Sequence, residues 1–347
     1  MADRGVVGVA SVTIAALLFG VVAVLVKFAT VPPLILLQFR SVVQLLLSFI
    51  ALALLKAARG ADRSNFLWLG PRPLWGYIGL RSLLYWAFIS CWWLALTSLP
   101  VGDATCVVYL GPIFSALFAR LLLGERLPPV FPVCIALSLT GTALVTLGGG
   151  GAEPAPGSDS TANSAARSVG VASALCSAVA GGLLPVLTRK SKEAHWATIE
   201  LWSAAGSSFI FTPIGLLVWF YMPSIVGFTD SRSERVDKTR EAVTAVLHFQ
   251  PLLAIILALS LVGFAGLGLQ TYGYQREEAA RASMMTFLEV PFAYLMQWQV
   301  FGDVLTWLQA VGMSLIVLSC IVNVRHKLQA ASDAKSTARG GRGDVRA

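Results

Sequence analysis

Ten segments of about 20 mostly apolar residues follow one another along the 347-residue chain, and they restrict its fold more than any other feature. Inside a lipid bilayer the backbone must satisfy its own hydrogen bonds, so only helices and closed barrels can cross it. The alternation of polar and apolar residues that barrel strands require does not occur in the sequence. We therefore predict an all-α membrane protein with ten transmembrane helices, at residues 6–26, 34–55, 74–96, 104–123, 130–147, 169–187, 197–221, 252–274, 282–300 and 304–324.

Composition supports this class. Hydrophobic residues make up 56% of the chain and charged residues 13%, whereas a soluble domain has about 45–50% and about 25%. The first segment is longer than the core of a signal peptide and lacks a small-residue cleavage site, so we expect it to be retained. The five cysteines lie in apolar sequence, and no Cys/His spacing typical of a metal site occurs. We expect no metal, no cofactor and no disulfide framework.

The basic residues predict the orientation of the chain, because cytoplasmic loops carry the excess of Lys and Arg. With the N-terminus in the cytoplasm, most basic residues near span ends fall on the cytoplasmic side, among them Arg72, Arg189 and Lys327. Both termini are therefore predicted to be cytoplasmic. We attribute the net charge of +8 to topology and lipid headgroups rather than to nucleic-acid binding, because the sequence holds no basic soluble domain. The membrane itself, plasma membrane or endomembrane, is not encoded in a recognisable motif.

Two similar motifs indicate an internal duplication. Leu110-Gly111-Pro112 and Glu289-Val290-Pro291 are each followed about a dozen residues later by a glycine and an acid, in Gly124-Glu125 and Gly302-Asp303. The two copies are 178 to 179 residues apart. For the Gly-acid pairs we expect tight turns, with the acid capping the following helix.

A linker divides the chain into two halves of five spans each. Residues 148–168 are rich in Gly, Ala, Ser and Pro, as flexible linkers are, and they separate a first repeat at 6–147 from a second at 169–324. Because five is odd, the second repeat must enter the membrane in the opposite sense. Such inverted repeats are typical of secondary transporters, whose substrate site lies near the midplane between the repeats. The tail at 329–347 is predicted to be a disordered cytoplasmic segment.

Motifs in both halves resemble a known family. They are Phe19-Gly20 to Lys27, Arg40, Trp93-Leu94-Ala95-Leu96, Pro112 to Gly124-Glu125-Arg126-Leu127, and Glu289-Val290-Pro291. On these residues the chain resembles the drug/metabolite transporter (DMT) superfamily with two EamA-type repeats, and within it the eukaryotic G-type solute carriers, the acyl-malonyl-condensing-like group. The resemblance implies a ten-helix exporter or carrier of amino acids or other metabolites. Phosphate-translocating members bind their substrates through basic residues in late spans, and the eighth and tenth spans here have no Lys or Arg in their interiors. A phosphorylated sugar is therefore not the expected substrate.

Four ionisable residues lie well inside predicted spans, two of each sign: Arg40, Arg81, Glu200 and Glu289. Charged groups at this depth are costly and usually face a cavity or a partner. Arg40 forms a polar stripe with Gln44, one helical turn later, and could bind a carboxylate or carbonyl of a substrate; a structural ion pair with Glu200 or with another helix explains the stripe equally well. For Arg81, near the cytoplasmic end of its span, the favoured interpretation is a side chain that reaches the lipid headgroups, and substrate contact is the alternative.

Aromatic and polar residues of the third and eighth spans extend this set. Along the third span Arg81, Tyr85, Phe88 and Trp92 share one face, a pattern more typical of packing than of a ligand site, although the deep Tyr85 hydroxyl needs a partner. In the eighth span Gln270 and Tyr274 are expected to line the cavity or its inner gate.

Glu289 is the strongest single candidate for substrate or proton binding. Burial disfavours the ionised form of a carboxyl, so this side chain could exchange protons. Pro291 removes a backbone donor beside it and should kink the helix. The alternative is an ion pair with an arginine that fixes the helix. In the first half Tyr109 and Pro112 hold the corresponding positions without a carboxyl, so the two copies differ at this place.

Two classes of function remain. The first is a secondary transporter that moves a small organic metabolite, such as an organic acid or amino acid, by alternating access, with proton coupling or exchange. The alternative is a non-transporting regulatory membrane protein of the same fold. We expect no enzyme, because the sequence contains no Gly-x-Ser-x-Gly motif, no deep Cys/His pair and no nucleotide-binding loop. The expected partners are a small-molecule substrate and the lipid bilayer, with a homodimer as one alternative for the oligomeric state.

Overall fold

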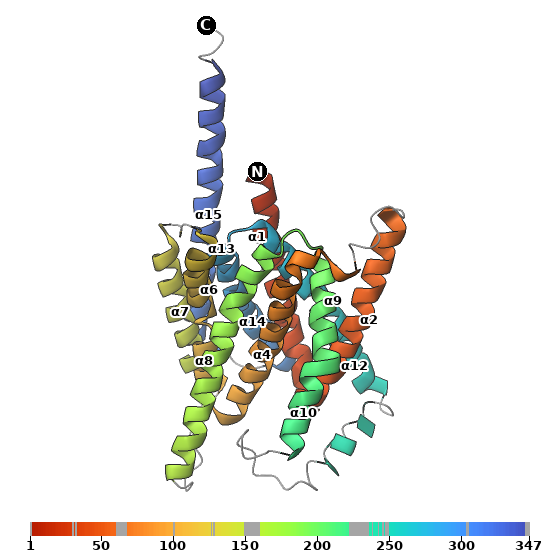
Figure 1. Cartoon of the computed structure of the whole chain (residues 1–347). Coiled ribbons are helices and arrows are strands. Elements are labelled where there is room, and N and C mark those ends of the chain that lie inside the picture. The colour runs from red at the N-terminus through yellow and green to blue at the C-terminus, as the bar shows by residue number, and fades with distance from the viewer. Residues whose placement is uncertain are drawn as a thin grey trace.

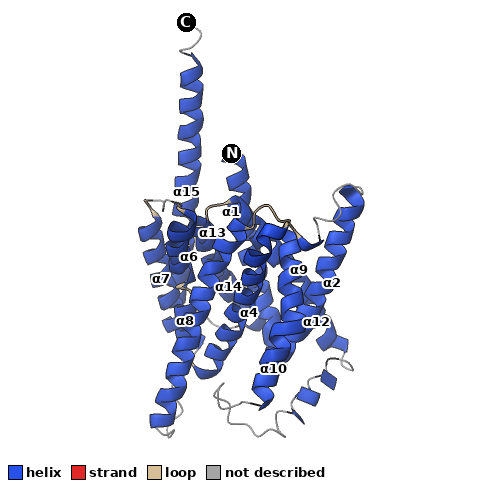
Figure 2. Ribbon diagram, viewed as in Figure 1, coloured by secondary structure: helices blue, strands red, loops and turns tan. Residues whose placement is uncertain are grey.

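The computed structural model describes residues 2–29, 31, 33–59, 68–99, 101–125, 127, 129–148, 160–221, 236–237, 239–241, 243–244, 246, 250–302 and 305–343. In this part of the chain all regular secondary structure is helical (Figure 2). The long helices run side by side in one bundle, with both termini on the same side (Figure 1). The helices of the first half are α1 (Ala2–Phe28), α2 (Pro33–Arg59), α4 (Trp75–Ser98), α5 (Val101–Val108), α6 (Gly111–Phe118) and α7 (Phe131–Gly148). Those of the second half are α8 (Ser160–Lys190), α9 (Trp196–Gly206), α10 (Thr212–Tyr221), α12 (Gln250–Arg276), α13 (Ala279–Met284), α14 (Glu289–Phe301) and α15 (Trp307–Gly343).

Short irregular turns interrupt or precede several of these helices. They are two 3-10 turns, η2 (Arg72–Leu74) and η6 (Met285–Leu288), and two π turns, η3 (Ala119–Leu123) and η4 (Ser207–Phe211).

Eight helices of the described chain are long and apolar enough to cross a membrane, which confirms an all-helical, multi-pass membrane protein. They are Val6–Val26, Leu34–Ala58, Ala104–Leu123, Phe131–Gly148, Arg167–Lys190, Trp196–Val218, Gln250–Arg276 and Trp307–Gln329. The third and ninth predicted spans are also helical but are not among the eight. The third is α4, an uninterrupted helix from Trp75 to Ser98 that contains Arg81. The ninth is divided between α13, η6 and α14.

The most extensive helix packing joins the two halves. α1 packs along α12 and α14, and α8 packs in the same way along α4 and α6. α7 lies against α15, and α2 lies against α9. The first half of the chain therefore shares its main packing surfaces with the second half.

Glycines permit close approach at equivalent places in both halves. A Cβ atom added to Gly182 of α8 would lie 2.6 Å from Phe114 Cβ of α6, and one added to Gly20 of α1 would lie 2.7 Å from Phe292 Cδ1 of α14. Phe292 follows Phe114 by 178 positions, the spacing of the repeated motifs. The contact between a glycine and a phenylalanine thus recurs with the sequence motif.

The prolines and Gly-acid turns of the repeat have structural counterparts. The helix is interrupted before Pro112, between α5 and α6, and the 3-10 turn η6 lies immediately before α14, which contains Pro291. Gly124 and Gly302 have positive φ values of 66° and 71°, a conformation that glycine adopts at little cost, and each ends a helix. The predicted capping role of the acid is wrong for Glu125, which accepts a hydrogen bond from Ala279 of α13 rather than from the following helix α7. Asp303 lies outside the described residues.

Two predicted flexible segments differ from the structure where it describes them. α8 already begins at Ser160, within the predicted linker 148–168, of which 149–159 lie outside the described residues. α15 continues to Gly343, far into the predicted disordered tail. Both stretches contain alanine, and the tail adds lysine and arginine, so high helix propensity allows the neighbouring helices to extend.

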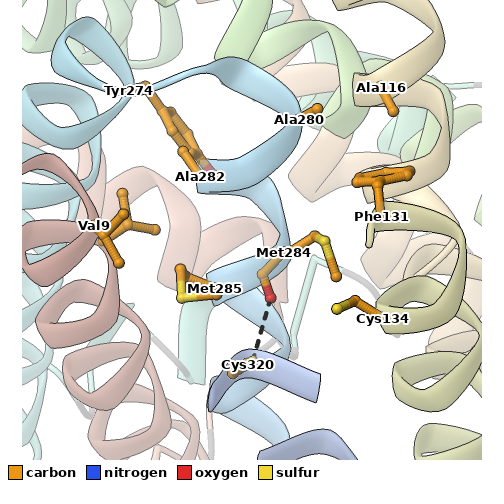
Figure 3. Packing of buried hydrophobic residues seen from close by; sticks show 11 residues of the cluster. Val9, Ala116, Phe131, Cys134, Tyr274, Ala280, Ala282, Met284, Met285 and Cys320 are labelled. Atoms are coloured by element: carbon orange, nitrogen blue, oxygen red, sulfur yellow. Dashed lines mark hydrogen bonds between the residues drawn. The ribbon is translucent and has the colours of Figure 1, made fainter. Parts of the chain in front are cut away.

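A hydrophobic cluster fills the end of the bundle beneath the connection between α12 and α13 (Figure 3). It joins α1, α6, α7, α12, α13 and α15 through Val9, Val12, Ala116, Phe131, Cys134, Tyr274, Ala280, Ala282, Met284, Met285 and Cys320. The Cys320 thiol contacts the carbonyl of Met284 at 3.7 Å, so α13 covers this cysteine.

Candidate functional site

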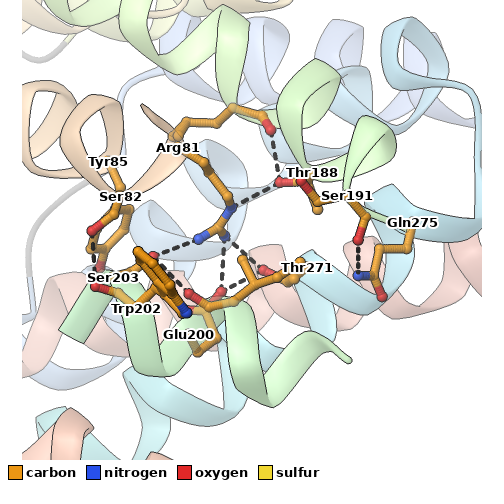
Figure 4. Close-up of polar contacts among 12 residues, drawn as sticks. Arg81, Ser82, Tyr85, Thr188, Ser191, Glu200, Trp202, Ser203, Thr271 and Gln275 are labelled. Atoms are coloured by element: carbon orange, nitrogen blue, oxygen red, sulfur yellow. Dashed lines mark hydrogen bonds and ion pairs between the residues drawn. The ribbon is translucent and has the colours of Figure 1, made fainter. Parts of the chain in front are cut away.

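A buried ion pair joins the halves inside the bundle. Arg81 of α4 donates a hydrogen bond of 2.8 Å to Glu200 of α9 (Figure 4). Their side chains are 3% and 0% exposed. Two opposite charges at this depth stabilise each other only if their remaining donors and acceptors also find partners.

Hydroxyl and amide groups supply those partners. Arg81 also donates to Thr188 of α8 at 2.9 Å, to Ser203 of α9 at 2.7 Å and to Thr271 of α12 at 2.8 Å. The second carboxylate oxygen of Glu200 accepts a 3.2 Å hydrogen bond from Gln44 of α2. The first also accepts a bond of 2.5 Å from the Thr271 hydroxyl. This network of six residues therefore ties α2 and α4 of the first half to α8, α9 and α12 of the second.

The network corrects two interpretations drawn from the sequence. Arg81 does not extend to the lipid headgroups, because packing between α4, α8 and α9 turns its guanidinium towards the interior. The partner of Glu200 is Arg81 and not Arg40. Thr188, Ser203 and Thr271 were not foreseen, since an isolated hydroxyl residue in a span is common and its spacing carries no signal of the partner.

A second polar group lies around Arg40 and Glu289. Arg40 of α2 lies 3.4 Å from the Tyr85 hydroxyl of α4, a long hydrogen bond. On its other side Arg40 faces α12, where a Cβ added to Gly263 would be 3.4 Å from Nη2. Glu289, at the start of α14, lies within electrostatic range of Arg40. The structure thus brings a cation of the first half and a carboxyl of the second towards each other.

Polar aromatic side chains surround this pair. Tyr109, just after α5, and Tyr274 of α12 both lie within electrostatic range of Glu289. Tyr109 stacks on Phe287 of η6, with ring centroids 5.4 Å apart. Gln270 hydrogen-bonds Tyr274 one turn away on α12. These residues come from α12, from η6 and from the turn after α5, so several elements of both halves lie around the pair.

Exposure separates the two polar groups. Arg81, Glu200 and Gln44 are buried, whereas Arg40 and Glu289 are partly exposed although helices surround them. Tyr109 and Gln270 are also partly exposed, and Tyr85 and Tyr274 are buried. All nine residues predicted from the sequence therefore fall into one of two groups: the buried network of Arg81 and Glu200, and the group around Arg40 and Glu289, in which both charged residues are partly exposed.

The rest of the aromatic stripe on α4 packs between helices. Phe88 and Trp92 lie 6.1 Å apart. An added Cβ on Gly181 of α8 would be 2.9 Å from the ring of Phe88. Among the described residues no group of three or more His, Cys, Asp or Glu could hold a metal ion.

Comparison with known proteins decides the family. The EamA-like transporter family matches residues 6–147 and 168–325. The chain belongs to this family. It is accordingly a membrane transporter of the drug/metabolite transporter superfamily and not an enzyme, and its two EamA matches mark a duplicated architecture.

Individual relatives are distant but cover most of the chain. The pseudopaline exporter CntI of Pseudomonas aeruginosa is 24% identical over 325 residues, 92% of this chain and 96% of the exporter. The human solute carrier family 35 member G1 is 24% identical over 259 residues, 72% of this chain and 62% of the carrier. A probable transport protein of Saccharomyces cerevisiae, YPL264C, is 24% identical over 276 residues, 75% of this chain and 71% of the yeast protein. A solved crystal structure shares the fold with a TM-score of 0.66 at 19% identity, covering 94% of this chain and 98% of the solved one.

Proposed function

We propose that this EamA-family protein is a secondary transporter that moves a small organic metabolite by alternating access. Its ten spans form two five-helix repeats of opposite topology, at 6–147 and 169–324, joined by a linker. The recurring contacts of α1 with α12 and α14, and of α8 with α4 and α6, support this arrangement, because each pairing repeats when the halves are exchanged. The basic residues of the connecting segments favour cytoplasmic termini in the plasma membrane or an endomembrane. A homodimer remains a prediction.

The substrate site of this proposal contains Arg40 and Glu289. Arg40 comes from the first half, Glu289 from the second, and both are partly exposed inside the bundle. This juxtaposition is the observation that carries the proposal. A guanidinium binds carboxylates through several donors, while a carboxylate binds an amine. Tyr85, Tyr109, Gln270 and Tyr274 offer further polar contacts around them.

The substrate class follows from the two charges. An amino acid or a related zwitterion would place its carboxylate on Arg40 and its amine on Glu289. An organic acid would use Arg40, and protonation of Glu289 would then remove the repulsion between two carboxylates. Arg81, Gln44 and Glu200 are assigned a supporting role in this proposal, since their polar atoms are already paired with one another.

Uptake into proteoliposomes tests the function. The purified protein is reconstituted and offered radiolabelled alanine and radiolabelled succinate, with and without an imposed pH gradient. We expect saturable uptake of at least one probe. Absence of uptake for a wider panel of amino acids and organic acids would contradict transport and favour the regulatory alternative.

Glu289→Gln separates the two substrate classes. The amide cannot attract an amine by charge, so alanine uptake should fall by about tenfold or more. Succinate uptake should persist and become insensitive to the pH gradient, because the proton-binding group is gone. Unchanged uptake of both probes with an unchanged response to pH would contradict the role of this carboxyl.

A further inference from the structure

The connection between α12 and α13 is held by residues of both halves at the face that carries the termini. Glu125, which follows η3 in the first half, accepts a 3.0 Å hydrogen bond from the backbone N–H of Ala279. The same carboxylate forms an ion pair with Arg189 at the end of α8. Arg189 in turn donates to the backbone carbonyl of Glu277. One acidic side chain of the first half therefore binds two elements of the second.

Other first-half residues hold the same connection. The Ser115 hydroxyl of α6 donates to the Ala279 carbonyl at 3.4 Å. A Cβ added to Gly8 of α1 would lie 3.1 Å from Glu277 Cβ, so α1 leaves no room for this turn to move inward.

The ionic surroundings are charge-balanced. Glu277 is paired with Lys327 of α15 and lies 3.6 Å from Arg281, which lies 3.4 Å from Glu278. Together with Glu125 and Arg189 this gives three acidic and three basic side chains. Of the three acids, Glu125 is the one supplied by the first half, so it is the residue whose release would separate the halves here.

The connection lies close in sequence to two residues of the candidate substrate site. Tyr274 lies three positions before Glu277, and Glu289 lies ten positions after Ala279. Beneath the connection lies the hydrophobic cluster with Cys320, which α13 covers (Figure 3). Movement of the connection would therefore displace both substrate-site residues and uncover the cluster.

We propose that Glu125, Arg189 and the N–H of Ala279 form an inter-repeat lock that keeps the terminus-bearing face closed. The transporter opens this face when Glu125 releases both partners. This inference rests on the proposed alternating access, but the closure itself can be measured without a substrate.

The test uses Cys320 as a reporter in the full-length protein. Cys91, Cys106 and Cys176 are replaced by serine and the buried Cys134 by alanine, and the rate of labelling by a membrane-impermeant maleimide is measured in detergent. Glu125→Ala leaves the Arg189 guanidinium and the Ala279 N–H without this acceptor, which penalises the closed state. We expect labelling of Cys320 to accelerate about tenfold.

Two control variants distinguish the lock from a general effect of charge. Arg189 and Ala279 bind different oxygens of Glu125, and Glu125→Gln keeps only one acceptor oxygen, so its labelling rate should lie between those of the parent and Glu125→Ala. Glu278→Ala removes an acid of the same cluster whose partner Arg281 lies in the same half, and its labelling rate should stay within about twofold of the parent.

A labelling rate of Glu125→Ala equal to that of the parent would overturn the proposal. If Glu125→Ala does not yield monodisperse protein, Arg189→Ala is used in its place. Labelling of Cys320 should accelerate about tenfold in this variant too, and a rate equal to that of the parent would overturn the proposal. The labelling assay needs no substrate, so its result does not depend on whether uptake is observed. The lock and the transport function are therefore tested independently.

Discussion

Arg81 and Glu200 meet at 2.8 Å where neither side chain is exposed by more than 3%. A buried ion pair of this kind contributes little net stability over an apolar pair, because both charges lose their hydration. It does fix which helices meet, because the hydroxyls of three further residues complete it only in one arrangement. The network thereby aligns α4, α8, α9 and α12 beside the proposed substrate site.

Loss of one partner from this network is expected to be severe. Glu200→Ala leaves a buried guanidinium without its counter-charge, which should cost about 3–5 kcal/mol of stability. Glu200→Gln should cost less, since the amide oxygen still accepts from Arg81. Thermal unfolding of the detergent-purified variants measures both, with the exposed Glu278→Ala as the reference. Equal unfolding temperatures for Glu200→Ala and the parent would show that Arg81 finds a substitute partner.

Close packing of α7 on α15 predicts a strong effect of a single methyl group. A Cβ at Gly141 would lie 2.5 Å from the carbonyl oxygen of Gly312 and 2.8 Å from Ile316 Cγ1. Gly141→Ala should therefore destabilise the protein by about 1–3 kcal/mol, because the two helices must move apart. Gly76→Ala in α4 is the matched control. It has no neighbouring atom within 4 Å, so it should be neutral or stabilise by up to about 1 kcal/mol through helix propensity. Equal unfolding temperatures for the two variants would show that the α7–α15 contact can open without cost.

The sequence was sufficient for the membrane class and the duplication, because both depend on local patterns. The length of an apolar segment is set by bilayer thickness, and Pro112 and Pro291 mark helix interruptions by their own geometry. Charge in apolar sequence likewise pointed to Arg40 and Glu289.

The partners of these charges could not be read in the same way. The sequence suggested Arg40 as the partner of Glu200, whereas the pairing with Arg81 follows from how α4 lies against α8 and α9. Glu125 looked like the cap of the next helix, yet its partners lie 64 and 154 positions away, at Arg189 and Ala279. Contacts of this range depend on how the halves pack, and no local pattern encodes that.

Arg40 and Tyr85 provide a graded test of the substrate site. Arg40→Gln removes the cation that would bind a carboxylate, so uptake of both alanine and succinate should fall by about tenfold or more. Tyr85→Phe removes only the long 3.4 Å bond to Arg40, and uptake should change by less than about threefold. Initial uptake rates in proteoliposomes, corrected for the amount of reconstituted protein, give the comparison. A larger effect of Tyr85→Phe than of Arg40→Gln would place the tyrosine hydroxyl, and not the guanidinium, on the substrate.

The Glu125 carboxyl predicts how stability depends on pH. It lies beyond the end of the span Ala104–Leu123. Burial raises its pKa, and Arg189 and the Ala279 N–H offset part of this rise. The folded state therefore holds the proton more firmly than the unfolded state does. As pH falls from above the folded pKa to below the ordinary carboxyl pKa, the parent should gain stability relative to Glu125→Gln, which has no titrating group at this position.

Unfolding temperatures of the parent and Glu125→Gln between about pH 8 and about pH 4 measure this difference, since the ordinary glutamate pKa lies near the lower limit. Above the folded pKa the two curves should run parallel, and the parent should gain on the variant only at lower pH. The opposite trend would mean that the charge of Arg189 outweighs burial. In that case Glu125 would hold the connection between α12 and α13 chiefly as an ion, and Glu125→Gln should label Cys320 as fast as Glu125→Ala does.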